Sequence, residues 1–337
     1  SSGLEFVVQQ RDASPASRQQ LCLAHCADYV DHVFDAVPDT GHIWLDDDTQ
    51  ANAKSLNAAL YSAGSGINAV DLVMQHSDTQ AFCLTRPPGH HAEYKAAKGF
   101  CIFNNIAIAA AYAMQQYGLQ RVLIVDFDVH HGNGTEDIFQ HEPRVLFCSS
   151  FEHPLYPYTG AETNNEHIIN LPLAGGCRGT AWREQVKQHW LPAIDRFAPQ
   201  LILISAGFDG HAEDEMAHFM LREEDYQWIA TELKQLADKH CQGTDPGGQG
   251  CRQEGGATTG RQGDPGGRLL RGIEGFAGGD QGMLVAVEKT QADEHRGRTG
   301  DKEWHRQHGH QRLALTKHQV DHKQRQQGQS QVLPPAY

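Results

Sequence analysis

The chain has 337 residues, of which 39% are hydrophobic, and its formal net charge is −14. This length can bury a large core, and one α/β domain of about 250 residues is a reasonable expectation. Residues 243–337 hold 13 Lys/Arg and 11 Asp/Glu, which leaves 15 and 31 in residues 1–242, a net charge of −16 there. Such an acidic surface argues against nucleic acid as a direct partner and favours cationic ligands such as lysine-rich peptides or polyamines.

The cysteines and the hydropathy pattern favour a reducing cytoplasm. None of the eight Cys lies in a C-x-x-C pair, and we find no signal peptide and no apolar run long enough to span a bilayer. We therefore expect a cytoplasmic protein without a membrane partner. Cys22 and Cys26 flank His25 on a segment that we predict to be helical, and we expect these thiols to be small core residues that bind no metal.

Short apolar runs alternate with helical patterns along the chain. We predict buried strands where the apolar runs lie, at residues 81–84, 122–125, 145–148, 168–171 and 201–204. We predict helices at residues 52–75, 106–112, 181–197 and 223–241. Asn104 or Asn105 can cap the second of these helices, and Gly118 can end it. This alternation predicts a parallel sheet covered by helices on both faces.

Residues 121–134 are the most informative stretch, because an apolar run ends there in acids and imidazoles at alternating positions. In a strand, side chains two residues apart share a face, so Asp126, Asp128 and His130 would point the same way. Open α/β sheets place their ligands at the carboxyl ends of such strands. This pattern predicts a metal site, and a polar turn closed by Gly132 and Gly134 is the alternative.

Two further strand ends carry the same kinds of side chain. Residues 85–91 end in two His after the apolar run at 81–84, and residues 203–209 end in Asp209 after the run at 201–204. Because the carboxyl ends of parallel strands meet at one edge of a sheet, these three segments favour a metal site over a simple polar turn.

Five motifs of the chain resemble those of the zinc-dependent histone deacetylases and their bacterial relatives in the arginase/deacetylase superfamily. They are Pro-Pro-Gly-His-His at 87–91, Gly-Phe-Cys-Ile-Phe-Asn-Asn at 99–105, Asp-Phe-Asp-Val-His-His-Gly-Asn-Gly at 126–134, Tyr-Pro-Tyr-Thr-Gly at 156–160 and Ser-Ala-Gly-Phe-Asp at 205–209. Their order and separations are similar to those of the family, and the resemblance covers roughly residues 20–242. Asn133, where other branches carry Asp, resembles the class II and bacterial subgroup. The resemblance implies an α/β fold of the arginase/deacetylase type, with a parallel sheet and helices on both faces.

The resemblance also implies an amidohydrolase that removes an acetyl group from a lysine side chain of a protein or from an acetylpolyamine. The expected zinc ligands are Asp128, His130 and Asp209. Three protein ligands and one open position are typical of catalytic zinc, which activates a water molecule as the nucleophile. Two carboxylates and a neutral imidazole also balance the charge of the dication.

The adjacent imidazoles of His90 and His91 are the expected acid–base groups. By resemblance, His91 acts as general base and then protonates the leaving amine, and His90 supports it electrostatically. Asp126 is expected to pair with His90, and Asn133 with His91, because such partners orient imidazoles by accepting their other N–H. Asp126 is then not a zinc ligand.

The family also binds potassium near this strand, through carbonyl oxygens and the first Asp. The candidates here are Asp126, Asp128, His130, Ser149 and Ser150. For the two serines, an ordinary strand end is the alternative interpretation.

The family's substrate enters through a narrow tube with aromatic walls, which suits the alkyl stem of acetyl-lysine. Phe100, which follows Gly99, and Tyr156 occupy the matching positions. A core position is the alternative for either aromatic residue. The three Asp at residues 46–48 are candidates for contact with the substrate backbone at the rim, or form a solvated acidic turn.

The chain departs from the family pattern where a Tyr usually follows Gly-Gly and donates a hydrogen bond to the developing oxyanion. The sequence has no Tyr between Tyr226 and Tyr337, and residues 254–257 read Glu-Gly-Gly-Ala. Loss of one oxyanion donor typically costs about 10²–10³ in rate. An impaired protein that binds zinc and acetyl-lysine is therefore the alternative function. The paired His after Pro-Pro-Gly disfavours a third possibility, a two-manganese ureohydrolase on the same fold.

The two ends of the chain also depart from the pattern. We assign residues 1–242 to a deacetylase catalytic domain and residues 243–337 to a tail rich in Gly, Gln, Arg and His, expected to be disordered or out of frame. Its one short apolar run, at 283–287, is expected to bury little. The family's first strand has no counterpart before Ser14, so we expect a domain that is incomplete at both ends.

Overall fold

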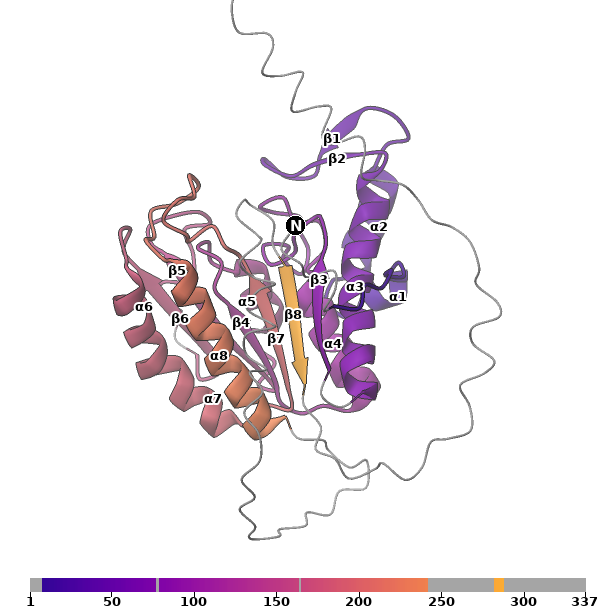
Figure 1. The fold of residues 1–337 in the computed structure, drawn as a ribbon. Coiled ribbons are helices and arrows are strands. Elements are labelled where there is room, and N and C mark those ends of the chain that lie inside the picture. The colour runs from indigo at the N-terminus through magenta and orange to yellow at the C-terminus, as the bar shows by residue number, and fades with distance from the viewer. Residues whose placement is uncertain (1–7, 77–78, 164, 242–281, 288–337) are drawn as a thin grey trace, which may run out of the picture. The chain divides into compact units, whose positions relative to one another are not determined.

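A six-stranded sheet forms the centre of the computed structural model, which describes residues 8–76, 79–163, 165–241 and 282–287 (Figure 1). The strand order is β3-β8-β7-β4-β5-β6. The strands are β3 (Thr79–Leu84), β4 (Val122–Asp126), β5 (Val145–Glu152), β6 (Ile168–Leu173), β7 (Leu201–Ala206) and β8 (Gly282–Val287). A separate antiparallel pair joins β1 (His42–Trp44) and β2 (Gln50–Asn52). All five predicted apolar runs lie in strands of the large sheet, so these predictions are confirmed.

Four neighbouring strands of the sheet, β7, β4, β5 and β6, run parallel. Every residue of β4 is buried, as expected of a central parallel strand. The last residue of β4, Asp126, is in register with Ser149 on one side and with Ser205 on the other. The predicted parallel sheet is thus confirmed for these strands, and their carboxyl ends meet at one edge.

The strand β8 comes from the segment that we had assigned to the tail. Its backbone pairs antiparallel with both β3 and β7, so that β3 runs in the same direction as the four parallel strands. The backbone of residues 283–287 thus forms a strand, and the expectation that this run buries little stays a prediction. The strand forms because β3 and β7 each offer an unpaired edge to the strand between them. The remainder of the predicted tail lies outside the described residues.

Helices cover the sheet in two groups (Figure 1). The first group contains α3, α4 and α5, and the second contains α6, α7 and α8. The helices are α1 (Arg18–Leu21), α2 (Ala27–Ala36), α3 (Ser55–Gln75), α4 (Asn105–Tyr117), α5 (Asn133–Phe139), α6 (Gly179–Gln185), the π-helix η2 (Val186–Trp190), α7 (Leu191–Phe197) and α8 (Glu223–His240). The four predicted helices are confirmed, and the one predicted at 181–197 runs through α6, η2 and α7. No described helix has the length and apolar character needed to cross a bilayer.

The helix predicted around Cys22 and Cys26 is wrong, because turns separate α1 from α2 at this point. Cys22 is exposed and is no core residue, whereas Cys26 is partly buried and packs against the core. His25, by contrast, is buried, and its imidazole Nε2 accepts a hydrogen bond from the Asn104 backbone N–H at 2.8 Å. The core residue of this segment is therefore the histidine.

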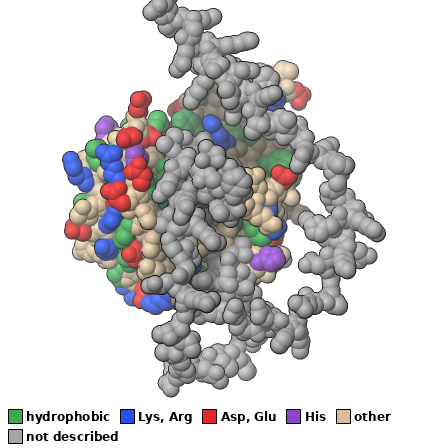
Figure 2. Space-filling view, viewed as in Figure 1, with side chains coloured by type: hydrophobic (Ala, Val, Ile, Leu, Met, Phe, Trp, Pro, Cys, Tyr) green, Lys and Arg blue, Asp and Glu red, His purple; other side chains and the backbone are tan. Residues whose placement is uncertain are grey.

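Figure 2 shows acidic and basic side chains side by side over the part of the surface where α6, α7 and α8 lie. Exposed ion pairs on these helices include Lys239 of α8 with Asp195 of α7. The acidic excess of the sequence is therefore not gathered over these helices.

Asn104 joins three elements near the carboxyl edge of the sheet. As the N-cap of α4, its Oδ1 accepts a hydrogen bond from Ala107 N at 3.0 Å. Its Nδ2 donates to the Ala92 carbonyl at 3.1 Å and to Thr135 Oγ1, in α5, at 3.2 Å. The side chain is fully buried, so all of these groups depend on it for hydrogen bonds.

We expect Asn104→Ala to lower the free energy of unfolding by about 2 kcal/mol, because it removes a helix cap and leaves a buried carbonyl unpaired. Urea denaturation followed by circular dichroism measures the change. The matched control is Asn57→Ala on the exposed side of α3, which should change stability by less than about 0.5 kcal/mol. Equal stability of the two variants would contradict a structural role for Asn104.

Candidate active site

Two carboxylates and one imidazole meet at the carboxyl edge of the sheet. Asp128 and His130 lie in the loop after β4, and Asp209 lies in the loop after β7. The His130 Nδ1 atom is 3.1 Å from Asp128 Oδ1 and 2.9 Å from Asp209 Oδ2. One ligand atom from each residue lies within 4.8 Å of the others. The structure therefore brings together the three residues predicted to bind zinc.

Backbone groups fix the two carboxylates of this triad. Asp128 Oδ1 accepts a hydrogen bond from His130 N at 2.8 Å, and Asp209 Oδ1 accepts one from Val129 N at 3.0 Å. A Cβ atom at Gly207 would lie 2.0 Å from Asp128 Oδ2, so only glycine leaves room for this carboxylate.

The charge of the triad suits a cation. Burial alone would lower the pKa of His130, but the carboxylates of Asp128 and Asp209 outweigh burial and raise this pKa to about 10. Burial and the charge of Asp128 raise the pKa of Asp209 to about 6. Two carboxylates that hold a proton on an imidazole so strongly form a site with excess negative charge. The donor set of two oxygens and one imidazole nitrogen also fits zinc.

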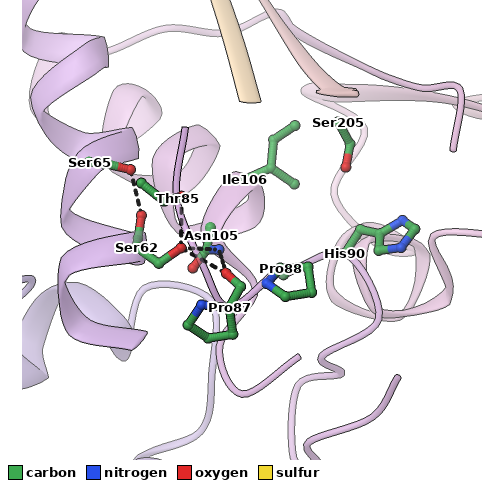
Figure 3. Close-up of a pocket in the computed structure, with 10 residues that line it drawn as sticks. Ser62, Ser65, Thr85, Pro87, Pro88, His90, Asn105, Ile106 and Ser205 are labelled. Carbon is green, nitrogen blue, oxygen red and sulfur yellow. Dashed lines mark hydrogen bonds between the residues drawn. The ribbon is translucent and has the colours of Figure 1, made fainter. Parts of the chain in front are cut away.

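Side chains of α3 and α4 hold the loop that carries His90 and His91 (Figure 3). Ser62 of α3 donates a hydrogen bond to the Pro87 carbonyl at 2.8 Å, and Asn105 of α4 donates to the same carbonyl at 3.2 Å. At the other end of the loop, the His90 carbonyl accepts hydrogen bonds from the N–H groups of the first turn of α5, at 3.0 and 3.2 Å. The rigid turn that Pro-Pro-Gly predicted is thus held at both ends.

The two imidazoles of this loop have different partners. His90 Nδ1 is 2.9 Å from Asp126 Oδ2, and His91 Nδ1 is 2.7 Å from Asn133 Oδ1. The ring centroids lie 4.0 Å apart, and both side chains are buried. Burial and the adjacent His90 hold the pKa of His91 well below its ordinary value. Both predicted contacts are therefore present, and the surroundings of His91 favour its neutral form.

Asp126 does not join the triad, although alternation in a strand would place it beside Asp128 and His130. It is the last residue of β4, and its other oxygen, Oδ1, accepts a hydrogen bond from Asp128 N at 3.2 Å. The chain leaves the sheet directly afterwards, so the period of two no longer applies. The interpretation from alternation alone is wrong here, and the resemblance correctly paired Asp126 with His90.

The candidate potassium residues Ser149 and Ser150 are buried in β5. Ser149 Oγ lies 3.2 Å from His131 Nδ1, and Ser150 Oγ accepts a hydrogen bond from Trp182 Nε1 at 3.0 Å. Both hydroxyl groups thus have protein partners, and potassium binding stays a prediction.

The loop that carries Gly99 and Phe100 passes directly over His91. Gly99 has a φ of +56°, and a Cβ atom there would lie 2.3 Å from His91 Cδ2. Gly99 N donates to Asp48 Oδ1 at 2.9 Å, and Phe100 N donates to Thr49 Oγ1 at 3.2 Å. Asp48 therefore positions this loop, a role that neither interpretation of the acidic turn included.

The two aromatic residues predicted to line a channel differ in exposure, because Tyr156 is partly buried and Phe100 is exposed. The Tyr156 ring stands perpendicular to the His91 ring, with centroids 5.1 Å apart, and lies 6.4 Å from the His130 ring. Burial and the nearby Asp48 carboxylate raise the pKa of Tyr156. Phe100 is 59% exposed. Tyr156 therefore covers the imidazoles of the site, and the part of Phe100 in a channel stays a prediction.

Sequence reasoning missed two residues that contact this site. Glu93 Oε1 accepts a hydrogen bond from Asn133 Nδ2 at 2.7 Å. The imidazole of the buried His131 lies 2.9 Å from Glu136 Oε2. The position of Glu93, two residues after His91 in the same loop, was the available signal. His131 lies inside the motif at 126–134, but its partners Ser149 and Glu136 come from β5 and α5.

Comparison with known proteins agrees with this geometry. The histone deacetylase domain matches residues 2–247. The chain is 38% identical to histone deacetylase 10 of Oryza sativa subsp. japonica over 70% of its own length, and 37% identical to a histone deacetylase-like amidohydrolase of Pseudomonas aeruginosa over 72%. It is 35% identical to a polyamine deacetylase of Rattus norvegicus over 70% of its length.

These matches span 57%, 65% and 43% of the lengths of the three relatives, in the same order. Among solved structures, the HD domain of HDA15 is similar, with a TM-score of 0.65 and 34% identity over 68% of this chain and 67% of that one. The domain match covers well over half of the chain and includes the triad and the histidine pair. The chain therefore belongs to the histone deacetylase family.

Proposed function

We propose that this chain is a zinc-dependent deacetylase that hydrolyses the acetyl amide of N-acetyl-lysine in proteins or of an acetylpolyamine. The observation that carries the proposal is a triad with the spacing to hold a metal ion, next to a buried imidazole that has a lowered pKa and whose Nδ1 faces an amide oxygen. Relatives named as histone deacetylase-like and polyamine deacetylases support this substrate class.

Asp128, His130 and Asp209 would hold the zinc ion, a donor set that is typical of catalytic zinc. The chemistry supplied at such a site would be polarisation of a carbonyl group and a lower pKa for water, towards about 7. A potassium ion near Asp126 and Ser149 is part of the same proposal. A cytoplasmic location, expected from the cysteines and the hydropathy pattern, is also proposed.

His91 is the proposed general base. If Nδ1 donates its proton to Asn133, the lone pair of Nε2 is available to accept a proton from water and to return it to the leaving amine. Its lowered pKa keeps the imidazole neutral before the reaction. His90 is different: burial lowers its pKa, but Asp126 and Asp128 outweigh burial and raise it. His90 would thus stabilise negative charge that develops beside His91.

The loop over His91 and the ring of Tyr156 are the proposed walls for the alkyl stem of the substrate. Gly99 brings backbone within contact of the imidazole, and Phe100 follows it at the exposed side. Such aromatic and glycine surfaces suit a thin apolar chain. The Asp48 carboxylate lies near both walls and would attract a cationic substrate.

A second candidate function is a zinc- and acetyl-lysine-binding protein without efficient turnover. The observation that favours it is the sequence itself, which has no Tyr between Tyr226 and Tyr337 to donate to the oxyanion. Zinc binding without release of acetate would identify this function.

Asp128→Ala should abolish both stoichiometric zinc binding and the release of acetate from an acetyl-lysine peptide, because it removes one of the three proposed ligands. Metal content by mass spectrometry and an enzymatic acetate assay measure the two effects. Asp35→Ala, at an exposed position of α2, is the matched control and should retain both. A variant at Asp128 that still binds zinc and releases acetate would refute the metal site.

His91→Ala should leave zinc content unchanged and lower kcat for acetate release by about 10²–10⁴, the usual contribution of a general acid–base group. His32→Ala, exposed on α2, should match the unmodified protein. If His91→Ala loses less than about tenfold in kcat, another residue is the base.

A further inference from the structure

We propose that Glu93 is a positioning residue, which fixes the orientation of the Asn133 amide and thereby determines which ring nitrogen of His91 carries the proton. This inference rests on the proposed function insofar as His91 acts as a base. Glu93 itself does not touch the reacting atoms, and its effect passes through Asn133.

The Asn133 side chain lies between an imidazole and a carboxylate. Its Oδ1 is 2.7 Å from His91 Nδ1, and its Nδ2 is 2.7 Å from Glu93 Oε1. Nδ2 also lies 3.4 Å from the His91 carbonyl. Asn133 is buried, so these protein groups decide which way the amide faces.

The chemistry of these three groups permits one arrangement. An ionised carboxylate only accepts hydrogen bonds, so Glu93 requires the NH2 group of Asn133 on its side. The amide oxygen then faces His91, and because this oxygen also only accepts, His91 Nδ1 must carry the proton. The lone pair of His91 is thereby placed on Nε2. If the amide were reversed, its oxygen would face the Glu93 carboxylate, and both groups only accept hydrogen bonds. The NH2 group would then face His91 Nδ1 and favour the tautomer with the proton on Nε2.

The same argument explains an amide, and not a carboxylate, at position 133. Aspartate there would place two carboxylates within hydrogen-bond distance, and such pairs do not both ionise readily. Asn133 and Glu93 are thus complementary: the carboxylate selects the amide, and the amide orients the imidazole.

Glu93 is held in place by its own contacts. Its side chain forms an ion pair with Lys98 at 3.1 Å, and its N–H donates to the Ala96 carbonyl at 2.9 Å. Its carbonyl lies 2.9 Å from Nδ1 of the buried His25, whose Nε2 accepts from Asn104 N. Since Nε2 accepts, His25 Nδ1 must donate to Glu93. Both the backbone and the side chain of Glu93 are therefore fixed next to Asn133.

The test is the tautomer of His91 in the zinc-loaded protein, measured by ¹H–¹⁵N correlation of labelled histidines and assigned with His91→Ala. The unmodified protein should show the proton on Nδ1. Glu93→Met, which keeps the length of the side chain and removes the acceptor, should populate the form with the proton on Nε2. Its kcat should fall about tenfold or more with KM changed less than twofold, because the wrong tautomer disables a base.

Lys98→Met is the matched control, because it removes the cation beside Glu93 and retains the acceptor. It should keep the proton on Nδ1. Retention of the pure Nδ1–H form in Glu93→Met would overturn the inference. A protein with the Nδ1–H tautomer that depends on Glu93, but that releases no acetate, would support this inference while refuting the proposed deacetylase activity.

A second pair of variants tests the complementarity without removing a side chain. Asn133→Asp should strongly reduce kcat, because it places a carboxylate beside both Glu93 and His91. Adding Glu93→Gln should restore part of the loss, because an amide again meets a carboxylate at that contact, whereas the carboxylate beside His91 remains. Rescue of this kind distinguishes positioning from general structural support. If the double variant is as impaired as the combined single effects predict, Glu93 does not act through residue 133.

Discussion

Three carboxylates with little or no access to water lie at one edge of the sheet. Imidazoles and backbone N–H groups around them compensate their negative charge. Asp126 and Asp128 are almost inaccessible, and Asp209 is little more exposed. Removing such charges from water costs several kcal/mol per ion unless partners replace the solvent. His90 pairs with Asp126. His130 and nearby backbone N–H groups form hydrogen bonds with the other two carboxylates. The negative charge that remains around His130 is what a divalent cation would balance.

The compensating groups lie on loops, so the fold must hold those loops rigidly. Asn104 connects the cap of α4 with the loop after His91, and Ser62 fixes the Pro-Pro-Gly turn from α3. The close approach of backbone atoms to the site also restricts its side chains. Gly99 and Gly207 lie where any Cβ would collide with His91 or Asp128, so backbone packs directly against the functional side chains. The positions of the imidazoles and carboxylates therefore depend on residues that take no part in the proposed reaction.

Local patterns in the sequence predicted the elements well, because buried parallel strands are continuous apolar runs and because Asn104 and Gly118 mark the two ends of α4. The triad combines residues that follow two different strands, and the family resemblance predicted this combination. Alternation did not predict it, because β4 ends at Asp126 and the period of two ends with the strand. Glu93 was missed because its partner, Asn133, is distant in sequence. The strand β8 was missed for a related reason: its place follows from the edges of β3 and β7, and its own composition carries little of that information.

Three buried imidazoles around this edge show how the partner of Nδ1 sets the state of a histidine. His90 faces a carboxylate, and its pKa is raised despite burial. His25 faces a backbone carbonyl, and burial lowers its pKa to about 4. His91 faces an amide, and burial with the neighbouring His90 lowers its pKa. Two protonated rings 4.0 Å apart would repel each other, so a carboxylate beside only one of them divides the pair into a cationic and a neutral member. The neutral amide of Asn133 keeps this difference between the two rings. The Glu93 carboxylate contacts Asn133 and not His91 Nδ1, so it can orient the amide without placing a negative charge next to the His91 ring.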